Sequence, residues 1–241
     1  MTIRTVLVTG VSRGLGLAIA ARLLADGYRV VGASRTESDE WKELAARYPE
    51  TAIFQALDMS DLDAISDVSR ALIKTHGSFW ALVNNAGIGT DGVLGTMHKH
   101  DIEKLVATNL LGPIFLTKYM MRAMLARRSG RIVNISSIIA STGFHGLSVY
   151  AATKAGLEGF TRSLSREAGK LKITVNCVAP GYMETEMTMS LQGDKLESVR
   201  RRAPLGLPTP EQVATAVSYL LSDDAAAITG TVLTVDGGST A

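Results

Sequence analysis

Cysteine is almost absent from this 241-residue sequence: Cys177 stands alone, so no disulfide can form within the chain. An excess of one charge is also lacking, because 25 Lys and Arg residues oppose 23 Asp and Glu residues, and a net charge of +2 is too small to indicate nucleic-acid binding. No apolar run approaches the roughly 20 residues that cross a bilayer, and the first four residues lack the apolar segment of a signal peptide. We therefore expect a soluble, cytoplasmic protein with neither nucleic acid nor a membrane as partner.

Metal-ligand patterns, repeats and linkers are missing too. The four histidines, at positions 76, 98, 100 and 145, form no metal-site spacing with cysteine or carboxylates. No internal repeat, low-complexity tract or linker interrupts the chain. With 46% hydrophobic and 20% charged residues it has ample material for a core, so we expect one domain over residues 1–241 and no metal.

The sequence does contain a regular alternation of strand and helix patterns. Apolar, β-branched strand patterns occupy residues 5–9, 28–33, 51–57, 79–83, 131–136, 172–178 and 231–235. Helix patterns occupy 15–25, 64–74, 101–127, 150–168 and 211–221, with a short sixth helix within 182–208. This order predicts an α/β fold: one doubly wound, Rossmann-type domain with a seven-stranded parallel sheet and helices on both faces. Right-handed crossovers then bring Gly10, Asn84, Ser137 and Pro180 to one edge, where ligands bind.

A glycine turn follows the first strand pattern. Gly10, Gly14 and Gly16 stand in the order Thr-Gly-x-x-x-Gly-x-Gly between strand 5–9 and helix 15–25. A strand, a glycine turn and a helix N-terminus together offer backbone N–H groups and the positive end of the helix dipole to a phosphate. The turn therefore favours a dinucleotide site; the alternative is a tight turn without a ligand.

The end of the second strand bears on which dinucleotide is bound. An NAD site usually has an acidic residue about 20 positions after the glycine turn, which binds the ribose hydroxyls; here that position is Ser34, followed by Arg35. Arg13 lies inside the glycine turn. Two guanidinium groups without a carboxylate favour the 2′-phosphate of NADP, although acidic residues follow at 37, 39 and 40. The alternative is that both arginines are ordinary surface residues.

Two further strand ends carry polar residues. Asp58, with Met59 beside it, follows the third strand and is placed to face an adenine; its other role would be to cap the helix that begins near Asp61. The Asn-Asn-Ala-Gly stretch 84–87 follows the fourth strand. Two amides and two small residues suit a turn in which the backbone approaches a ligand or ties strands together.

The pattern over residues 101–127 is apolar on nearly all sides, which predicts a helix buried on more than one face. Pro113 lies inside it and has no N–H, so the carbonyl of Asn109, four residues earlier, loses its helical partner. We expect a kink there, which makes both the backbone and the amide of Asn109 of interest. Helix 150–168 carries small residues on several sides, which predicts close packing against a partner subunit, in a homotetramer or at least a dimer.

The strongest candidate for chemistry lies between Ser137 and Lys154. Tyr150 and Lys154 are four residues apart on a predicted helix and therefore share a face. An ammonium about 4 Å from a phenol contributes roughly 4 kcal/mol at an effective dielectric of about 20. That is about 3 pKa units, which predicts a pKa of about 7 for Tyr150, suited to general acid–base catalysis. Ser137 supplies a hydroxyl for a substrate oxygen; the alternative is a solvated helix face, where such pairs are common.

Residues 182–208 follow an Ala-Pro-Gly break and are predicted to form a loop with a short helix. Methionines at 183, 187 and 189 are flexible, apolar side chains that suit a lid over an elongated apolar substrate. The alternative is that these methionines fill the core.

Together these motifs resemble the short-chain dehydrogenase/reductase family. The resemblance covers nearly the whole chain and rests on the glycine turn, Asn84-Asn-Ala-Gly87, Asn109, Ser137, Tyr150-x-x-x-Lys154 and Pro180-Gly181, in the family's order. It implies that Tyr150 donates the proton in reduction and that Lys154 lowers the Tyr150 pKa and binds the nicotinamide ribose. It also implies that Ser137 binds the substrate carbonyl and that Asn109 positions a water.

The resemblance also implies a site for NADP. The implied contacts are Gly10, Ser12, Arg13, Gly14, Leu15, Gly16, Ser34, Arg35, Asp58, Met59, Asn85, Ala86, Gly87, Tyr150, Lys154, Pro180, Gly181, Met183 and Thr185. Among them, the three glycines would hold the pyrophosphate, and Ser12 and the two arginines the adenosine phosphate. Asp58 and Met59 would border the adenine, Asn85 the adenosine-side ribose region, and Thr185 would meet the nicotinamide carboxamide.

Within the family, the stretches 9–16, 178–187 and 228–238 are most similar to 3-oxoacyl-[acyl-carrier-protein] reductases of fatty acid biosynthesis. This implies NADPH-dependent reduction of a carrier-bound ketone, with acyl carrier protein as a possible partner. Reductases of other small ketones, alcohols, sugars, polyketides or acyl-CoA share these stretches; outside the enzymes, the alternatives are a nucleotide-binding sensor and a structural subunit. An acidic carrier needs basic groups beside the active-site mouth, and the candidates are Arg127, Arg128, Arg131, Lys170 and Lys172. The alternative is that these are solvated loop charges, and the run Arg200–Arg202 is predicted to be an ordinary helix face.

Overall fold

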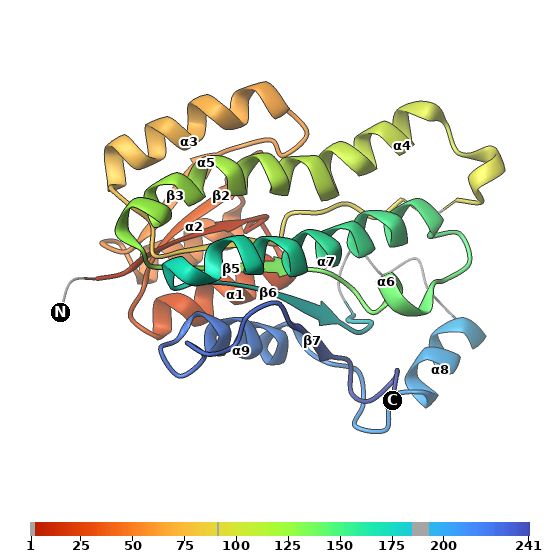
Figure 1. Cartoon of the computed structure of the whole chain (residues 1–241). Helices are drawn as coiled ribbons and strands as arrows, with labels where there is room; N and C mark the ends of the chain where they lie inside the picture. Colours follow the sequence, from red (N-terminus) through yellow and green to blue (C-terminus); the bar gives the residue numbers. More distant parts are fainter. Residues whose placement is uncertain (1–2, 91, 185–192) are drawn as a thin grey trace.

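The computed structural model describes residues 3–90, 92–184 and 193–241 and contains one seven-stranded, all-parallel sheet (Figure 1). The strands are β1 (Thr5–Thr9), β2 (Arg29–Ser34), β3 (Ala52–Ala56), β4 (Ala81–Asn84), β5 (Gly130–Ile135), β6 (Ile173–Pro180) and β7 (Val232–Val235). Their order across the sheet is β3-β2-β1-β4-β5-β6-β7. The order reverses between β1 and β4, which is the switch point where open α/β sheets bind ligands. The predicted fold is confirmed, and the strand limits agree to within two residues.

Helices cover both faces of the sheet. On one face α1 (Gly14–Ala25), α2 (Asp39–Arg47) and α9 (Pro210–Leu221) share a core cluster with the strands. On the other, α3 (Leu62–His76), α5 (Gly112–Arg127) and α7 (Ser148–Ala168) share a second cluster. The β1 side chains alternate between them, with Val6 and Val8 in the first and Leu7 in the second. A strand buried on both faces needs such a continuous apolar run.

Helix α2 has no counterpart among the predicted helices. Ser38 caps it, because its hydroxyl accepts from the Trp41 N–H at 3.1 Å, and Asp39 begins an acidic first turn. Trp41 and Leu44 are buried and anchor the helix. The Trp41 ring occupies the space that a side chain at Gly32 would need. A serine, two acidic residues and apolar residues three apart are a recognisable helix start.

The predicted helix 101–127 is divided where Pro113 indicates a break. Helix α4 (Lys99–Val106) passes into a π-helical turn (Ala107–Leu111), and α5 then begins at Gly112. The Gly112 N–H donates to the Ala107 carbonyl, five residues back, and Pro113 follows in the first turn of α5. A residue without an N–H is tolerated there, so the expected kink takes the form of a π turn.

The remaining elements are short. They are a 3-10 turn at Leu94–Thr96, α6 (Ile139–Thr142), a 3-10 turn at Gly169–Leu171 and α8 (Asp194–Arg201), of which α8 is the helix predicted within 182–208. Cys177 is a buried core residue of β6, and burial raises the pKa of its thiol to about 11. Within the described ranges, no helix is both long and apolar enough to cross a membrane.

Candidate active site

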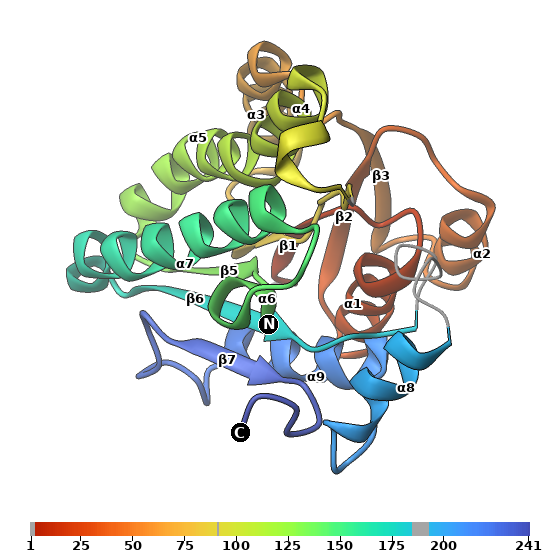
Figure 2. The same cartoon turned by 90° about the vertical axis from the view of Figure 1, so that its right-hand side faces the viewer.

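The carboxyl ends of the strands carry the predicted site residues to one edge of the sheet (Figure 2). Gly10 follows β1, the stretch 85–87 follows β4, Ser137 follows β5 and Gly181 follows β6. Helix α7 adds Tyr150 and Lys154 to the same edge. The sequence-predicted residues therefore converge as the topology requires.

Tyr150 and Ser137 form a hydrogen-bonded pair. Tyr150 is a half-buried residue in the first turn of α7, and its phenol hydrogen-bonds the Ser137 hydroxyl. The Ser137 Oγ also accepts from the Ile139 N–H at 3.2 Å, which fixes its orientation. Two hydroxyl groups thus lie together where a substrate oxygen is able to reach both.

Lys154 is buried close to Tyr150, on the same face of α7. Only 4% of it is exposed, its Nζ donates to the Ile135 carbonyl at 2.8 Å, and the same atom lies 5.6 Å from the centroid of the Tyr150 ring. A Cβ added at Gly87 would lie 3.5 Å from the Lys154 Nζ, so the backbone after β4 passes close to the ammonium. Burial lowers the pKa of Lys154 to about 8.

The pKa of about 7 that was predicted for Tyr150 is wrong for the chain without a bound cofactor. Burial raises the Tyr150 pKa above its ordinary 10.0, and the hydrogen bond with Ser137 offsets part of that rise. The Lys154 ammonium donates to a backbone carbonyl, and its Nζ lies 5.6 Å from the centroid of the phenol ring. Burial is the larger effect on the Tyr150 pKa, so the phenol stays protonated at neutral pH.

Asn109 lies fully buried within the π turn. Its Oδ1 accepts from the Ile88 N–H at 2.9 Å, and its Nδ2 donates to the Ile88 carbonyl at 2.9 Å. A third, longer contact of 3.5 Å joins Nδ2 to the Thr153 hydroxyl. The amide is thus committed to the segment after β4.

The glycine turn is packed too closely for side chains. Gly10 has φ +76°, and a Cβ there would lie 2.8 Å from Ala86 Cα; Gly14 has φ +55°. A Cβ at Gly16 would collide with the Gly10 carbonyl. The backbone of the turn, with the N-terminus of α1 behind it, therefore lies open at the sheet edge for a phosphate. Leu15, in the first turn of α1, packs against the core.

Asn85 ties the glycine turn to β4. Its Nδ2 donates to the carbonyls of Thr9 and Gly10, at 2.8 and 3.3 Å. The Thr9 hydroxyl, which the sequence analysis did not single out, accepts from the N–H groups of Asn85 and Ala86, both at 3.0 Å. Its position directly before the first glycine is the signal for this role. The amide of Asn84 likewise joins β4 to Thr117 and Asn134.

The end of β2 has the chemistry expected of a phosphate site. Ser34 is buried, and its hydroxyl accepts from the Ser12 N–H at 3.2 Å, inside the glycine turn. Arg35 is exposed. Asp58 accepts from both the N–H and the hydroxyl of Ser60. Burial by itself would raise the Asp58 pKa, but these bonds, with Arg35 and Lys104, hold it below its ordinary value. Asp61, and not Asp58, caps α3.

The other predicted contacts are placed as follows. Arg13 is exposed at the N-cap of α1. The Met59 side chain is buried against Gly112. The Pro180 carbonyl accepts from the Ile138 N–H, and Gly181 packs against Asp236. Met183 packs on the core beside α1. Thr185 and the methionines at 187 and 189 lie outside the described residues.

Two residues that support Lys154 were missed. The Ser136 Oγ contacts the Lys154 carbonyl at 3.3 Å and the Glu158 carboxylate at 2.9 Å, and Glu158 also faces Arg162 at 3.7 Å. Tyr150, Lys154 and Glu158 are spaced four residues apart, so the helical face that predicted the pair also contains the signal for Glu158.

The basic residues proposed for a carrier protein do not lie beside this site in the same chain. The five candidates, Arg127, Arg128, Arg131, Lys170 and Lys172, are on or before the first residues of β5 and β6, at the edge of the sheet opposite Ser137. The six residues of β5 separate the two edges by about 20 Å. Arg131 is also buried, and its guanidinium lies 4.8 Å from the Trp80 ring centroid. The prediction that these residues lie beside the active-site mouth is therefore wrong, because residues that precede a strand lie at the edge of the sheet opposite its carboxyl end.

Among the described residues, His, Cys, Asp and Glu side chains nowhere gather in a group of three that is able to hold a metal ion. The chemistry of the site therefore rests on hydroxyl, phenol, amide and ammonium groups. This set is suited to moving a proton to or from an oxygen while a dinucleotide lies along the glycine turn.

Comparisons with known proteins agree with this site. Residues 4–196 match the family model for short chain dehydrogenases. The chain therefore belongs to the short-chain dehydrogenase/reductase family and is an oxidoreductase. This confirms the family predicted from the motifs.

The more particular likeness is to 3-oxoacyl-[acyl-carrier-protein] reductases. The chain is 40% identical to the one named FabG in Salmonella typhimurium, over 96% of this chain and 95% of that one, and equally to FabG of Escherichia coli K12. It is 38% identical to MabA of Mycobacterium bovis, over 98% and 92%. A solved Serratia marcescens short-chain dehydrogenase/reductase, a double mutant, superposes with a TM-score of 0.91 at 30% identity over 99% of this chain and 98% of that one.

Proposed function

We propose that this protein is an NADPH-dependent reductase that converts the ketone of 3-oxoacyl-[acyl-carrier-protein] to a 3-hydroxyacyl group. The proposal rests on one observation above all: Ser137, Tyr150 and Lys154 lie together beside the glycine turn. The substrate class is supported by the likeness along nearly the whole chain to the reductases named above. A cytoplasmic location is part of the proposal.

The described residues fit the cofactor. The open turn 10–16 suits the pyrophosphate, while Arg13 and Arg35 suit a 2′-phosphate, because no carboxylate stands at position 34. Asp58 lies near Arg35 at the next strand end, toward the adenine. Asn85 and Gly87 line the route from this end to Lys154. When bound there, NADPH supplies the hydride that the ketone carbon accepts.

The chain's own groups then handle the oxygen. Ser137 and Tyr150 donate hydrogen bonds to the carbonyl oxygen, and the Tyr150 phenol gives its proton as the oxygen gains negative charge. The raised Tyr150 pKa keeps this donor protonated at neutral pH. Lys154 binds the ribose hydroxyls and holds positive charge near the phenol. The main-chain carbonyl of Asn109 holds the water that returns a proton through Lys154.

Residues 182–208 form the proposed substrate lid. In its described parts, Met183 packs on the core, and Arg200 on α8 pairs with Glu184 and Glu197 within the same segment. The ion pairs occupy Arg200, so we assign the Arg200–Arg202 run to the helix surface and not to carrier binding.

A substrate panel tests the proposal. NADPH oxidation is followed with acetoacetyl carrier protein, acetoacetyl-CoA, a simple cyclic ketone and a ketose. We expect the carrier-bound thioester to give the highest kcat/KM. Reduction of only the simple ketone or the ketose would assign the enzyme to another branch of the family.

Delivery of the substrate by a carrier protein requires a second subunit of the enzyme. Arg128 and Lys170 are exposed neighbours, since the Arg128 Nη2 donates to the Lys170 carbonyl at 3.2 Å, but they lie at the far edge from their own Ser137. A carrier docked on them therefore delivers its thioester to the active site of a partner subunit. The charges mainly raise the association rate, and salt screens them.

Charge reversal separates carrier binding from chemistry. Arg128→Glu and added salt should lower activity on the carrier-bound substrate and leave activity on acetoacetyl-CoA nearly unchanged, while Lys74→Glu, an exposed lysine on α3, should affect neither. Equal losses on both substrates would mean that Arg128 has a structural role instead.

A further inference from the structure

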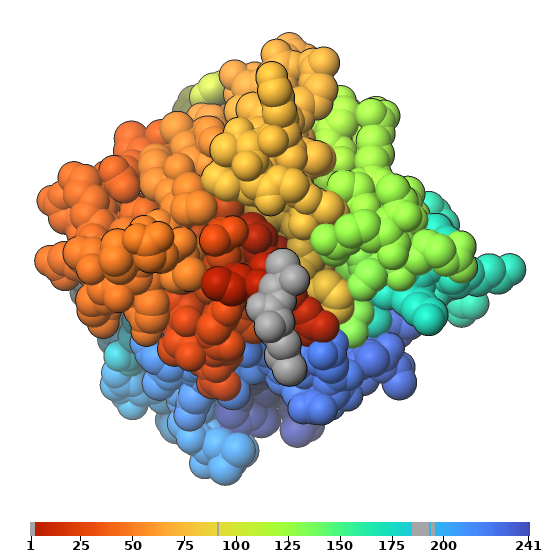
Figure 3. Space-filling view, turned by 90° about the vertical axis from the view of Figure 1, so that its left-hand side faces the viewer, coloured from red at the N-terminus to blue at the C-terminus, as the bar shows by residue number. Residues whose placement is uncertain are grey.

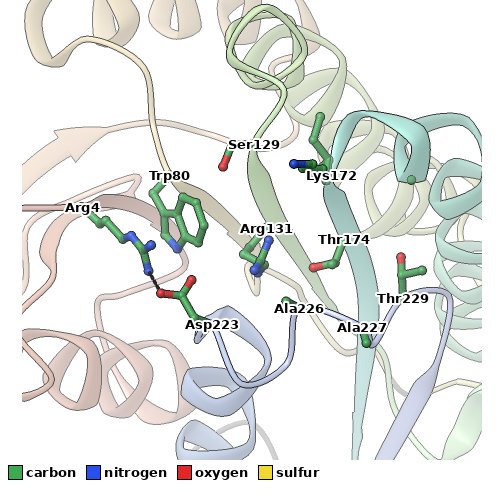
Figure 4. Close-up of a pocket in the computed structure, with 12 residues that line it drawn as sticks. Arg4, Trp80, Ser129, Arg131, Lys172, Thr174, Asp223, Ala226, Ala227 and Thr229 are labelled. Carbon is green, nitrogen blue, oxygen red and sulfur yellow. Dashed lines mark ion pairs between the residues drawn. The ribbon is translucent and has the colours of Figure 1, made fainter.

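A pocket of about 460 Å³ opens at the edge of the sheet where the strands begin (Figure 4). It is walled by residues at or just before the starts of β1, β4, β5 and β6 and by the connection between α9 and β7. Figure 3 looks at the face of the molecule from which the strands start. Ser137 lies about 20 Å away, at the other end of β5, so this pocket is separate from the candidate active site.

Arg131 contributes an unusual buried charge to this pocket. Only 5% of the residue is exposed, its Nη1 donates to the Gly130 carbonyl at 3.1 Å, and its Nε has no partner. Within the described ranges, no carboxylate lies at ion-pair distance from it. Burial lowers the Arg131 pKa, which reflects a guanidinium that is poorly solvated. The guanidinium lies 4.8 Å from the centroid of the Trp80 ring, a contact that offsets part of its charge. Buried charges are normally also paired with an opposite charge, so the missing carboxylate points to an anionic ligand.

Polar groups of the neighbouring strand face the same space. Thr174 is the residue paired with Arg131 across β5 and β6, it is 5% exposed, and its Oγ1 also lacks a partner. Ser129 and Lys172 each precede one of these residues by two positions and line the pocket as well. In Figure 4 the Lys172 ammonium and the Thr174 hydroxyl both point toward the Arg131 side. Two cations and two hydroxyls thus line the same pocket.

The opposite wall is rigid and aromatic. The Trp80 Nε1 donates to the Leu221 carbonyl at 3.2 Å, and the Arg4 guanidinium lies 3.9 Å from the ring centroid. Arg4 pairs with Asp223 at 3.1 Å, so its charge is compensated. Because Asp223 is the one acidic residue among those lining the pocket, Arg131 and Lys172 leave it with an excess of positive charge.

We propose that this pocket binds the phosphoryl group of a small phosphorylated metabolite. A guanidinium, an ammonium and two hydroxyls supply more donors than a carboxylate readily accepts, and they match the three terminal oxygens of a phosphate ester. The volume lies in the range of small-molecule sites. The space beside Trp80 and Ala226 is left for the organic part of the ligand.

Calorimetric titration of the intact enzyme tests this site. NADP is present at saturation, so that the phosphate subsite of the cofactor is filled, and the probes are inorganic phosphate and phenyl phosphate. We expect saturable binding of both, with phenyl phosphate tighter. Thr174→Val and Lys172→Asn should each weaken binding about tenfold, as the loss of one hydrogen bond to a charged group predicts. Asparagine tolerates the left-handed backbone of Lys172, where φ is +58°.

Lys74→Gln removes one positive charge outside the pocket and should leave both affinities unchanged. The thermal melting of each variant shows that it is folded. Absence of saturable binding by either probe, affinities that Thr174→Val and Lys172→Asn leave unchanged, or benzoate binding as tightly as phenyl phosphate would each overturn the proposal. Cofactor binding is measured in a separate titration. A pocket that does not bind phosphate is therefore distinguishable from a failure of the proposed reductase function.

Discussion

At the scale of single residues, Lys154 is a cation that the fold holds almost out of contact with water. Its ordinary pKa of 10.5 falls to about 8 in the folded chain, a difference that corresponds to roughly 3 kcal/mol. Between those two pH values the unfolded chain binds a proton that the folded chain does not. Raising the pH through this window therefore stabilises the folded protein, and lowering it costs stability.

Replacing Lys154 with Met removes the titrating group and should remove this dependence. We expect the unfolding free energy of the unmodified protein, relative to Lys154→Met, to increase by up to about 3 kcal/mol from about pH 7 to about pH 10. Urea denaturation across this range provides the measurement. A difference between the two proteins that does not change with pH would show that Lys154 is solvated like a surface lysine.

The residues at the end of β2 decide the cofactor. Ser34 and Arg35 offer a hydroxyl and a guanidinium where a ribose-binding carboxylate would exclude a phosphate. We expect a strong preference for NADPH, and Ser34→Asp combined with Arg35→Asp should reverse it. Dissociation constants of both cofactors from protein fluorescence provide the test, with Lys42→Asp on α2 as a charge control. Equal use of NADPH and NADH by the unmodified protein would refute the assignment.

At the scale of elements, the π turn between α4 and α5 fastens the active site to the segment after β4. Asn109 makes both of its short hydrogen bonds to Ile88, so Asn109→Ala leaves the half-buried N–H and carbonyl of Ile88 unpaired. We expect a loss of about 2–4 kcal/mol in unfolding free energy, together with a lower kcat. Chemical denaturation measures the first and NADPH oxidation the second. Undiminished stability with a large loss of kcat would mean that the amide serves only the chemistry.

The helices and strands that depend on local sequence patterns were predictable. Continuous apolar runs indicated the central strands, and Pro113 indicated the break in the long helix. The sequence did not reveal that the break is a π turn, because the ring removes one N–H without specifying how the chain compensates. Helix α2 was overlooked because only two of its residues, Trp41 and Leu44, are buried, although its serine cap and acidic first turn are a recognisable helix start.

At the scale of the whole molecule, the parallel topology made it possible to predict which residues lie together in the site, but not how they contact one another. Ser137, Tyr150 and the glycine turn meet because every strand ends at the same edge. The Tyr150 pKa was not predictable, since it depends on burial and on the hydrogen bond with Ser137, which the spacing of Tyr150 and Lys154 does not contain. The same topology places Arg128 and Lys170 at the opposite edge, a consequence that their position before the strands already implied.

Assembly is the remaining whole-molecule prediction. Ala152, Ala155 and Gly159 form an exposed strip of small residues on α7, and a Cβ at Gly159 meets nothing within 4 Å in the single chain. We expect light scattering to give a homotetramer, or at least a dimer, of the 25.6 kDa chain. Gly159→Arg should dissociate it, while Gly159→Ala, which adds only a methyl group, should not. A 25.6 kDa particle for the unmodified protein at micromolar concentration would contradict the prediction.

The central claim is that the Tyr150 phenol donates the proton while Lys154 holds the cofactor. Its most direct test is the turnover of Tyr150→Phe with acetoacetyl carrier protein, measured beside the NADPH dissociation constant of the same variant. We predict a loss of about 10²–10⁴-fold in kcat with nearly unchanged NADPH affinity, whereas Lys154→Ala should lose both. A Tyr150→Phe enzyme that retained about a tenth of the activity would contradict the mechanism, since general acid catalysis contributes far more than tenfold.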